Sequence, residues 1–239
     1  SLAAAAIQFA VAYCDEVGSG STFFNPLVTG STATRSNYGQ YRTLVLGDEN
    51  AGFIFGNQSS SYFYALNIER ARYKEAILPG LTTIIIKSGS YQISLTDDSQ
   101  LNTAAVFTDA GRVYNLVSGS AGTINTSLTS NGWTTASGSY GWLLPDIGVI
   151  LLNGEALSGS NGGGGIQLPI SRSFDSGSVN PTHLIDALNL GSNFTLNSDE
   201  TLSSDYAFVR ARNSEYNYST NPSFISGSTG VVIFPEFIE

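Results

Sequence analysis

Short apolar runs separated by turn residues dominate the pattern of this 239-residue chain. Apolar segments of about four to eight residues, bounded by Gly, Ser, Thr, Asn or Pro, are typical of strands. Such segments occupy residues 53–55, 61–68, 81–87, 91–96, 113–117, 142–153, 165–170 and 231–237. The pattern predicts a mainly β protein built from antiparallel, β-sandwich-like sheets.

The spacing of these runs predicts two hairpins. The loop at residues 88–90 joins the third and fourth runs, and the loop at 56–60 joins the first and second. The run 61–68 is aromatic on both faces of a strand, which predicts a buried position in the sheet. Pro79-Gly80 is expected to form a turn. Pro145 lies inside an apolar run and indicates an edge strand or a bulge.

Two helices are expected. The Ala-rich run Leu2–Tyr13 places apolar residues over much of a helical circumference, which predicts a buried N-terminal helix. A signal peptide is the weaker reading of this run, because it has no positively charged n-region and Tyr13 is too bulky for a cleavage site. A second, short helix is predicted at 181–190, capped by Asn180 and ended by Gly191.

These elements suggest a domain organisation. Residues 1–18 would form the helical segment and a linker, and residues 19–239 would form a β-rich structural domain with a subdivision near 97–111. The chain lacks an initial Met and ends in an apolar run without a turn signal. Both features favour a fragment of a longer polypeptide.

The charge content narrows the class of protein. Hydrophobic residues make up 41% of the chain but charged residues only 12%, compared with about a quarter in ordinary soluble domains. A surface so poor in charge suits a chain that neighbours largely cover. The net charge of −9 argues against a nucleic-acid groove, which needs clustered positive charge. The N-terminal apolar run is too short to span a membrane, which takes about 20 residues.

Candidate catalytic and metal-binding residues are few, since the chain has one Cys and one His. Cys14 can form a disulfide only between chains, and a buried thiol is the favoured reading. Asp97-Asp98 could bind Ca²⁺, but Asp at a strand end usually accepts bonds from nearby backbone. His183 and Asp186 lack a nucleophile elbow nearby. We therefore expect no catalytic centre, no metal and no cofactor.

The most charged stretch is Glu69–Glu75. As a strand, it would place Arg70, Arg72 and Lys74 on one face. As a helix, it would place Arg70 and Lys74 on one face and pair Arg72 with a flanking Glu. Three interpretations are open: a solvated edge, a ridge at an interface between subunits, or a nucleic-acid contact.

A second candidate interface begins at Asp205. Alternation places Phe208, Arg210 and Arg212 on one face of an expected strand. Tyr216 and Tyr218 share a face beyond the following turn. Tyr and Arg are favoured in protein interfaces over Lys and Glu. The stretch is therefore suited to packing against another chain.

Four stretches of the sequence resemble virion structural proteins of contractile-tailed bacteriophages, especially those that infect cyanobacteria. The stretches are Asn37–Gly47, Glu69–Glu75 followed by Pro79-Gly80, Gly141–Ile150 and Phe208–Phe224. The resemblance implies a subunit of the baseplate or tail, and less so of the neck. Its expected partners are other virion proteins and copies of itself in a ring. Its expected location is the virion, assembled in the host cytoplasm.

The alternative function is a carbohydrate-binding adhesin or receptor-binding module of the tail. Trp133 and Trp142 could stack on the sugar rings of a host glycan, although Trp is more often part of the core in such folds. A third class, an enzyme such as a cell-wall hydrolase, is disfavoured by the single His and by the lack of paired carboxylates.

Overall fold

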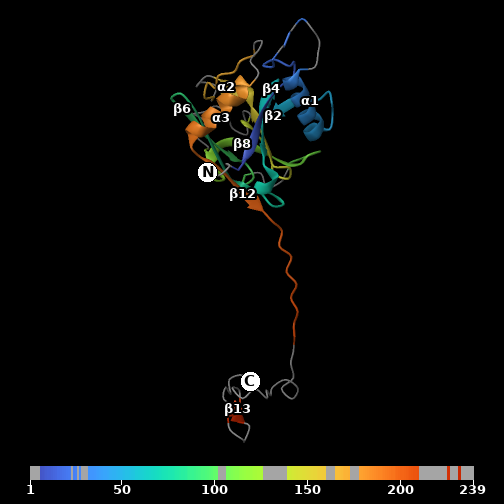
Figure 1. The fold of residues 1–239 in the computed structure, drawn as a ribbon, viewed down its shortest axis with the longest axis vertical. Coiled ribbons are helices and arrows are strands. Elements are labelled where there is room, and N and C mark those ends of the chain that lie inside the picture. Colours follow the sequence, from blue (N-terminus) through green and yellow to red (C-terminus); the bar gives the residue numbers. More distant parts are fainter. Residues whose placement is uncertain are drawn as a thin grey trace, which may run out of the picture. The chain divides into compact units, whose positions relative to one another are not determined.

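The computed structural model describes residues 6–22, 24–25, 27, 32–101, 106–125, 139–159, 165–172 and 178–209, and one pair of two-residue strands at 225–226 and 231–232. It confirms the mainly β class: a curled antiparallel sheet, a half-barrel, dominates the fold (Figure 1). The chain divides into two units, Ser1–Thr201 and Leu202–Glu239.

Within the first unit, strands and helices alternate irregularly along the chain. The strands are β1 Phe9–Asp15, β2 Phe53–Phe55, β3 Gln58–Ser60, β4 Tyr62–Ile68, β5 Ala76–Ser88, β6 Tyr91–Asp97, β7 Val106–Thr108, β8 Gly111–Ser120, β9 Thr123–Ile124, β10 Gly141–Leu144, β11 Val149–Asn153 and β12 Phe194–Asp199. The helices are α1 Ala33–Leu46, the 3₁₀ turn η1 Arg70–Arg72, α2 Gly154–Ser158 and α3 Val179–Gly191.

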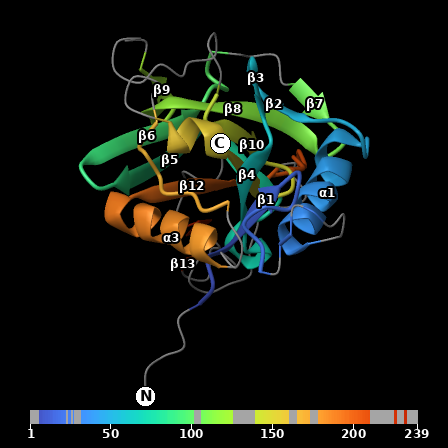
Figure 2. The same ribbon diagram turned by 90° about the horizontal axis from the view of Figure 1, so that it is seen from above.

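The main sheet runs in the order β1-β4-β11-β10-β8-β6-β5-β12, with β7 and β9 paired to β8. Its curl is visible in Figure 2. The two end strands approach each other: the rings of Phe9 on β1 and Phe194 on β12 meet edge to face, with centroids 5.2 Å apart. We call this meeting of β1 and β12 the seam. The separate hairpin β2–β3 lies apart from the main sheet.

The larger hydrophobic core collects side chains from most strands of the main sheet and from α2 and α3. Its largest fully buried members include Tyr13, Tyr64, Tyr140, Ile84 and Leu95. Burying aromatic and branched side chains in one cluster removes the most apolar surface from water per residue, and this drives the sheet to curl around them.

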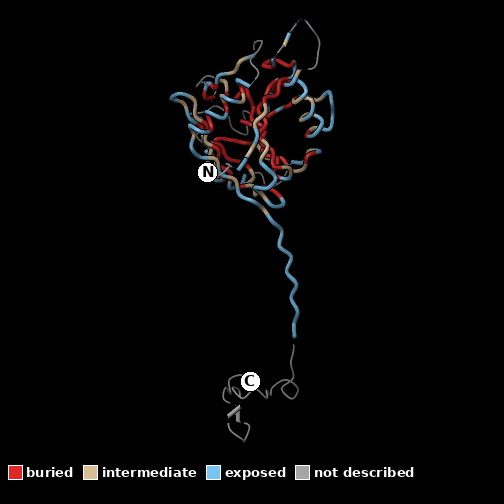
Figure 3. Tube along the Cα trace, viewed as in Figure 1, coloured by how far each residue is buried: buried red, intermediate tan, exposed pale blue. Residues whose placement is uncertain are grey.

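A second core lies on the other face of the same strands, under α1 and the β2–β3 hairpin. Strand β4 serves both cores, since Tyr64 and Leu66 enter the first while Phe63 and Ala65 enter the second. This confirms the buried sheet position predicted for residues 61–68. Figure 3 shows the buried residues concentrated within this unit.

Several predicted elements are confirmed. The loop at 88–90 connects a hairpin in which Ser88 pairs with Tyr91. Helix α3 covers the predicted 181–190, with Leu184 and Leu188 buried. The adjacent Ile185 is 39% exposed. The predicted cap is wrong: the helix begins at Val179 after Ser178, and the side chain of Asn180 bonds to the backbone of Ser171 instead.

The predicted N-terminal helix at Leu2–Tyr13 is wrong over the described residues. Residues Phe9–Asp15 form strand β1, paired along its whole length with β4. The run is apolar on every side, so its periodicity does not separate helix from strand. The backbone pairing with β4 is what makes this segment a strand. The helix of the N-terminal region is instead α1, whose end is marked by Gly47 in the left-handed conformation.

Four smaller predictions are also corrected. Pro79-Gly80 lies inside the long strand β5, where Gly80 has φ 90° and bends the strand. Pro145 lies in the turn between β10 and β11. The segment 56–60 contains β3, which pairs with β2, and residues 165–170 form no strand.

The second unit contains a two-residue pairing, β13 Ile225–Ser226 with β14 Val231–Val232. The strand expected from Asp205 is absent over the described residues 202–209, which are all exposed. Alternation predicts which residues would share a face, but a strand also needs a partner for its backbone. Arg210, Arg212, Tyr216 and Tyr218 lie outside the described residues.

Candidate interaction surface

The charged stretch Glu69–Glu75 links β4 to β5 at one end of the seam. It is neither the strand nor the helix that the sequence suggested: η1 makes one 3₁₀ turn, and Tyr73 then returns to an extended conformation. The turn closes with the Arg72 N–H donating to the Glu69 carbonyl at 2.8 Å. No side chain of η1 is buried.

The three cations of this stretch have different surroundings, so they do not form one ridge. Lys74 pairs with Glu200 next to β12. Arg70 stacks over the ring of Tyr73, with its guanidinium carbon 4.7 Å from the centroid, and donates to the Tyr73 carbonyl at 2.7 Å. Arg72 donates from Nε to the Ile7 carbonyl at 3.0 Å.

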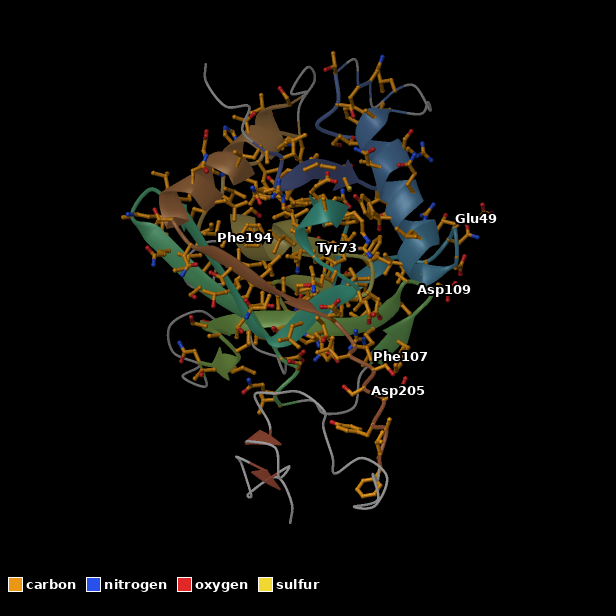
Figure 4. All side chains as sticks on the ribbon, turned by 60° about the horizontal axis from the view of Figure 1, so that its bottom comes forward. Glu49, Tyr73, Phe107, Asp109, Phe194 and Asp205 are labelled. Carbon is orange, nitrogen blue, oxygen red and sulfur yellow. The ribbon has the colours of Figure 1, made fainter. Side chains whose placement is uncertain are left out.

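An apolar cavity of about 330 Å³ opens at the seam beside these arginines. Its apolar lining consists of Phe9, Ile68, Tyr73, Ile77, Phe194 and Leu196. Its polar lining consists of Gln8, Arg72, Asn197 and Ser198. We call this cavity the seam recess; Figure 4 labels Tyr73 and Phe194, two of the residues that line it.

The seam recess exists because β1 and β12 approach without forming a ladder in the main sheet. The register of β12 against β5 also shifts between Thr195 and Asn197, which makes the pairing irregular beside the recess. Tyr73 is held there by close contact with Gly148, where φ is 66° and a Cβ would collide with the Tyr73 ring. A side chain at position 148 would therefore displace one wall of the recess.

The seam recess has arginines at its edge that take part in no ion pair among the described residues. Among the described residues, ion pairs join Lys74 to Glu200, Arg112 to Asp146 and Arg172 to Asp15. Arg70 and Arg72 have no carboxylate partner in that part of the chain. The result is a half-buried apolar hollow with two arginine charges at its edge that no described acid neutralises.

Asp15 forms a second polar cluster that the sequence did not reveal. This buried carboxylate accepts from the backbone N–H of Ser19 at 3.0 Å and from the Arg172 guanidinium at 2.9 Å. It also accepts from the hydroxyl of Tyr13. Burial, followed by the charge of Asp15, raises the pKa of Tyr13 well above its usual value. Both Asp15 oxygens are engaged, so the cluster ties the turn after β1 to the segment before α3.

The Asp97-Asp98 pair is also occupied by structural bonds. Asp97 accepts from the Ser99 N–H, as an Asx turn does, and from the Gly80 N–H at 2.7 Å. Asp98 accepts from the backbone and side chain of Asn115. The backbone-bonding interpretation of Asp97 is confirmed. Within the described residues, no group of three or more potential ligands is placed to hold a metal ion.

The remaining candidates have ordinary surroundings. Cys14 is fully buried and free, which confirms the interpretation as a buried thiol. Burial and then Asp15 raise the pKa of this thiol. His183 lies on α3 with Nδ1 2.9 Å from the Pro169 carbonyl. Trp142 is half-buried against Phe55, with ring centroids 4.9 Å apart. Trp133 lies outside the described residues.

Sequence reasoning found Arg70 and Arg72 but missed the apolar half of the surface. Phe9 was assigned to a helix, while Phe194 and Leu196 belong to a strand that had not been predicted. The alternation of Phe194 and Leu196 with the polar residues Thr195 and Asn197 is a strand signal that could have found β12. No signal in the sequence indicates that β1 and β12 meet.

Comparison of the chain with protein-family models, with curated proteins and with solved structures found no match. None of the helices in the described part of the chain has the length and apolar character needed to cross a bilayer.

Proposed function

We propose that this chain is a structural subunit of a tailed-bacteriophage particle, located in the baseplate or tail. It would act by burying surface against other virion proteins and copies of itself. The order of the four sequence blocks that resemble such proteins supports this proposal. So does the low charge content of 12%, which suits a surface covered by neighbours.

The structural observation that carries the proposal is the seam recess with Arg70 and Arg72 at its edge. Aromatic side chains and arginine are the residues that protein interfaces favour, and they contribute most to binding when they become desolvated. A half-buried aromatic hollow beside unneutralised arginines therefore fits a contact with another protein better than a bare solvent face.

The carbohydrate-binding alternative has less support. Trp142 packs against Phe53 and Phe55 from the β2–β3 hairpin. A sugar platform needs a ring face open to solvent, so this alternative rests on Trp133.

The test is to locate the chain in purified particles of the phage that encodes it. Mass spectrometry should detect the chain in gradient-purified particles, and immunogold labelling with antibodies against it should mark the tail or baseplate. Absence from purified particles would contradict the proposal. Labelling of fibre tips, combined with glycan-array binding that Trp133→Ala abolishes, would favour the carbohydrate-binding alternative.

A further inference from the structure

The seam recess has the size of a socket for one large side chain. Its volume of about 330 Å³ is near the lower limit of small-molecule sites, which span about 300–1,000 Å³. It is lined by six apolar side chains and four polar residues. One aromatic ring would match this volume and this mainly apolar lining better than an extended ligand with many polar groups would.

The lining is already positioned to receive a ring. Phe9 and Phe194 hold each other edge to face at 5.2 Å. Ile77 lies fully buried beneath, and Leu196 is half-buried. A ring inserted among these side chains would find the edge and face contacts that aromatic groups prefer, and it would remove their remaining apolar surface from water.

The arginines at the edge of the seam recess indicate which charged group of a partner should lie next to the inserted ring. Arg72 uses Nε to hold the Ile7 carbonyl, and its terminal nitrogens take part in no hydrogen bond or ion pair among the described residues. Arg70 is held against Tyr73, a wall of the recess. Two described acids near this stretch in the fold have partners of their own: Glu200 pairs with Lys74, and Glu75 accepts from the Thr201 N–H. A carboxylate from outside would complete the site.

We propose that the seam recess receives an aromatic side chain from an extended segment of a neighbouring protein chain, with an adjacent carboxylate of that segment paired to Arg72. The partner is thus an acidic, aromatic peptide stretch. This inference rests on the proposed function, because it names the chemistry of the partner that the interface selects. The ring supplies apolar contact, and the carboxylate sets orientation and specificity.

The test uses three capped dipeptides and the 239-residue chain labelled with ¹⁵N. The probes are acetyl-Phe-Glu-amide, acetyl-Phe-Gln-amide, which lacks the charge, and acetyl-Ala-Glu-amide, which lacks the ring. Amide shifts in two-dimensional NMR spectra report weak binding and its location. We expect acetyl-Phe-Glu-amide to shift the amides of Phe9, Tyr73 and Phe194. The uncharged probe should bind about two- to tenfold more weakly, and the probe without a ring should cause no shifts there.

Three variants and a control make the result specific. Arg72→Gln should weaken acetyl-Phe-Glu-amide to the level of the uncharged probe, and Arg72→Lys should restore most of the binding. Leu196→Trp should block binding by filling the recess. Arg35→Gln, which changes an exposed arginine on α1, is the matched control and should have no effect. The same spectra report whether each variant is folded.

Two outcomes would overturn the inference: no shifts at the recess, or equal shifts from all three probes. Its failure is distinguishable from failure of the proposed function. If purified particles contain the chain but no probe binds the recess, only the inference about the recess is contradicted. If the recess binds the probes selectively but purified particles do not contain the chain, only the proposed virion role is contradicted.

Discussion

Asp97 shows how a single buried carboxylate organises the backbone around it. The side chain is fully buried at the end of β6 and accepts from the N–H groups of Gly80 and Ser99. Gly80 lies where β5 bends, so Asp97 supports a backbone group that the bend removes from the sheet ladder. Its other oxygen, Oδ2, has no hydrogen-bond partner among the described residues.

We expect Asp97→Ala to lower the free energy of unfolding by about 1–3 kcal/mol, because the buried Gly80 N–H loses its acceptor. Urea unfolding followed by circular dichroism would measure the change. Asp48→Ala is the control, since Asp48 makes a similar bond to the Asn50 N–H at an exposed turn, and its effect should stay below about 0.5 kcal/mol. If the free energy of unfolding of Asp97→Ala is unchanged or higher, the desolvation of the buried carboxylate destabilises the fold at least as much as its hydrogen bonds stabilise it.

Asp146 illustrates a charged group tuned by its neighbours at the surface. Burial opposes its ionisation, but hydrogen bonds from the Arg112 side chain and backbone outweigh that effect and lower the pKa of the carboxyl. The approach is possible because Gly111 has φ 100° and no side chain to obstruct Asp146. The stabilisation is present above the pKa of an unfolded Asp, about 3.9, and is lost as the pH falls through the lowered value.

At the scale of elements, α3 packs one helical face against the large core. Leu184 is fully buried there, whereas the adjacent Ile185 is 39% exposed. The helix contacts β5 and β1, so it bridges strands near both ends of the curled sheet. Its packing therefore helps to hold the seam in place.

Leu184→Ala should destabilise the first unit by about 2–5 kcal/mol, because it removes buried methyl groups and leaves a cavity. Ile185→Ala, on the same helix, is the matched control and should cost under about 1 kcal/mol. Thermal unfolding followed by circular dichroism would compare the two. Equal losses would indicate that the helix is docked in a different rotation.

The success of sequence reasoning for α3 and its failure for β1 have one physical basis. Helix α3 carries its signals locally, in Pro181 of its first turn and in Gly191 at its end. Asn180, predicted as the cap, lies inside the helix and bonds the backbone of Ser171. The apolar run at β1 carries no such signal, and its conformation depends on the hydrogen bonds that β4 provides. Helix α1 also carries a local signal that the prediction did not use: Tyr38, Tyr41 and Val45 recur at helical spacing, and Gly47 marks its end.

At the scale of the whole molecule, the large core contains an unusual number of buried phenols. Tyr13, Tyr64 and Tyr140 are at most 2% exposed. Burial is the main cause that raises the pKa of each, and nearby Asp15 raises that of Tyr13 further. The hydroxyl of Tyr64 has no hydrogen-bond partner among the described residues. These phenols therefore favour the folded state only while they are neutral.

This arrangement predicts alkaline unfolding. Because the folded pKa values are raised, the stabilisation is complete below the pKa of an unfolded Tyr, about 10. It is lost as the pH rises above that value. The phenolate absorbance should titrate in two steps, exposed tyrosines first, and the second step should coincide with loss of circular dichroism. A single reversible step near pH 10 with native structure retained would contradict the prediction.

The sequence by itself determined the mainly β class, the β5–β6 hairpin, helix α3, the buried thiol of Cys14 and the exposed arginines of η1. Each of these follows from local periodicity, turn chemistry or residue type, which a chain carries wherever it folds. The tertiary structure alone decided the strand at β1, the separate contacts of Arg70, Arg72 and Lys74, and the seam recess. These depend on contacts between residues far apart in the sequence: Phe9 reaches Phe194 only because eight strands curl until the first meets the last. Side-chain alternation along each strand does not encode that meeting.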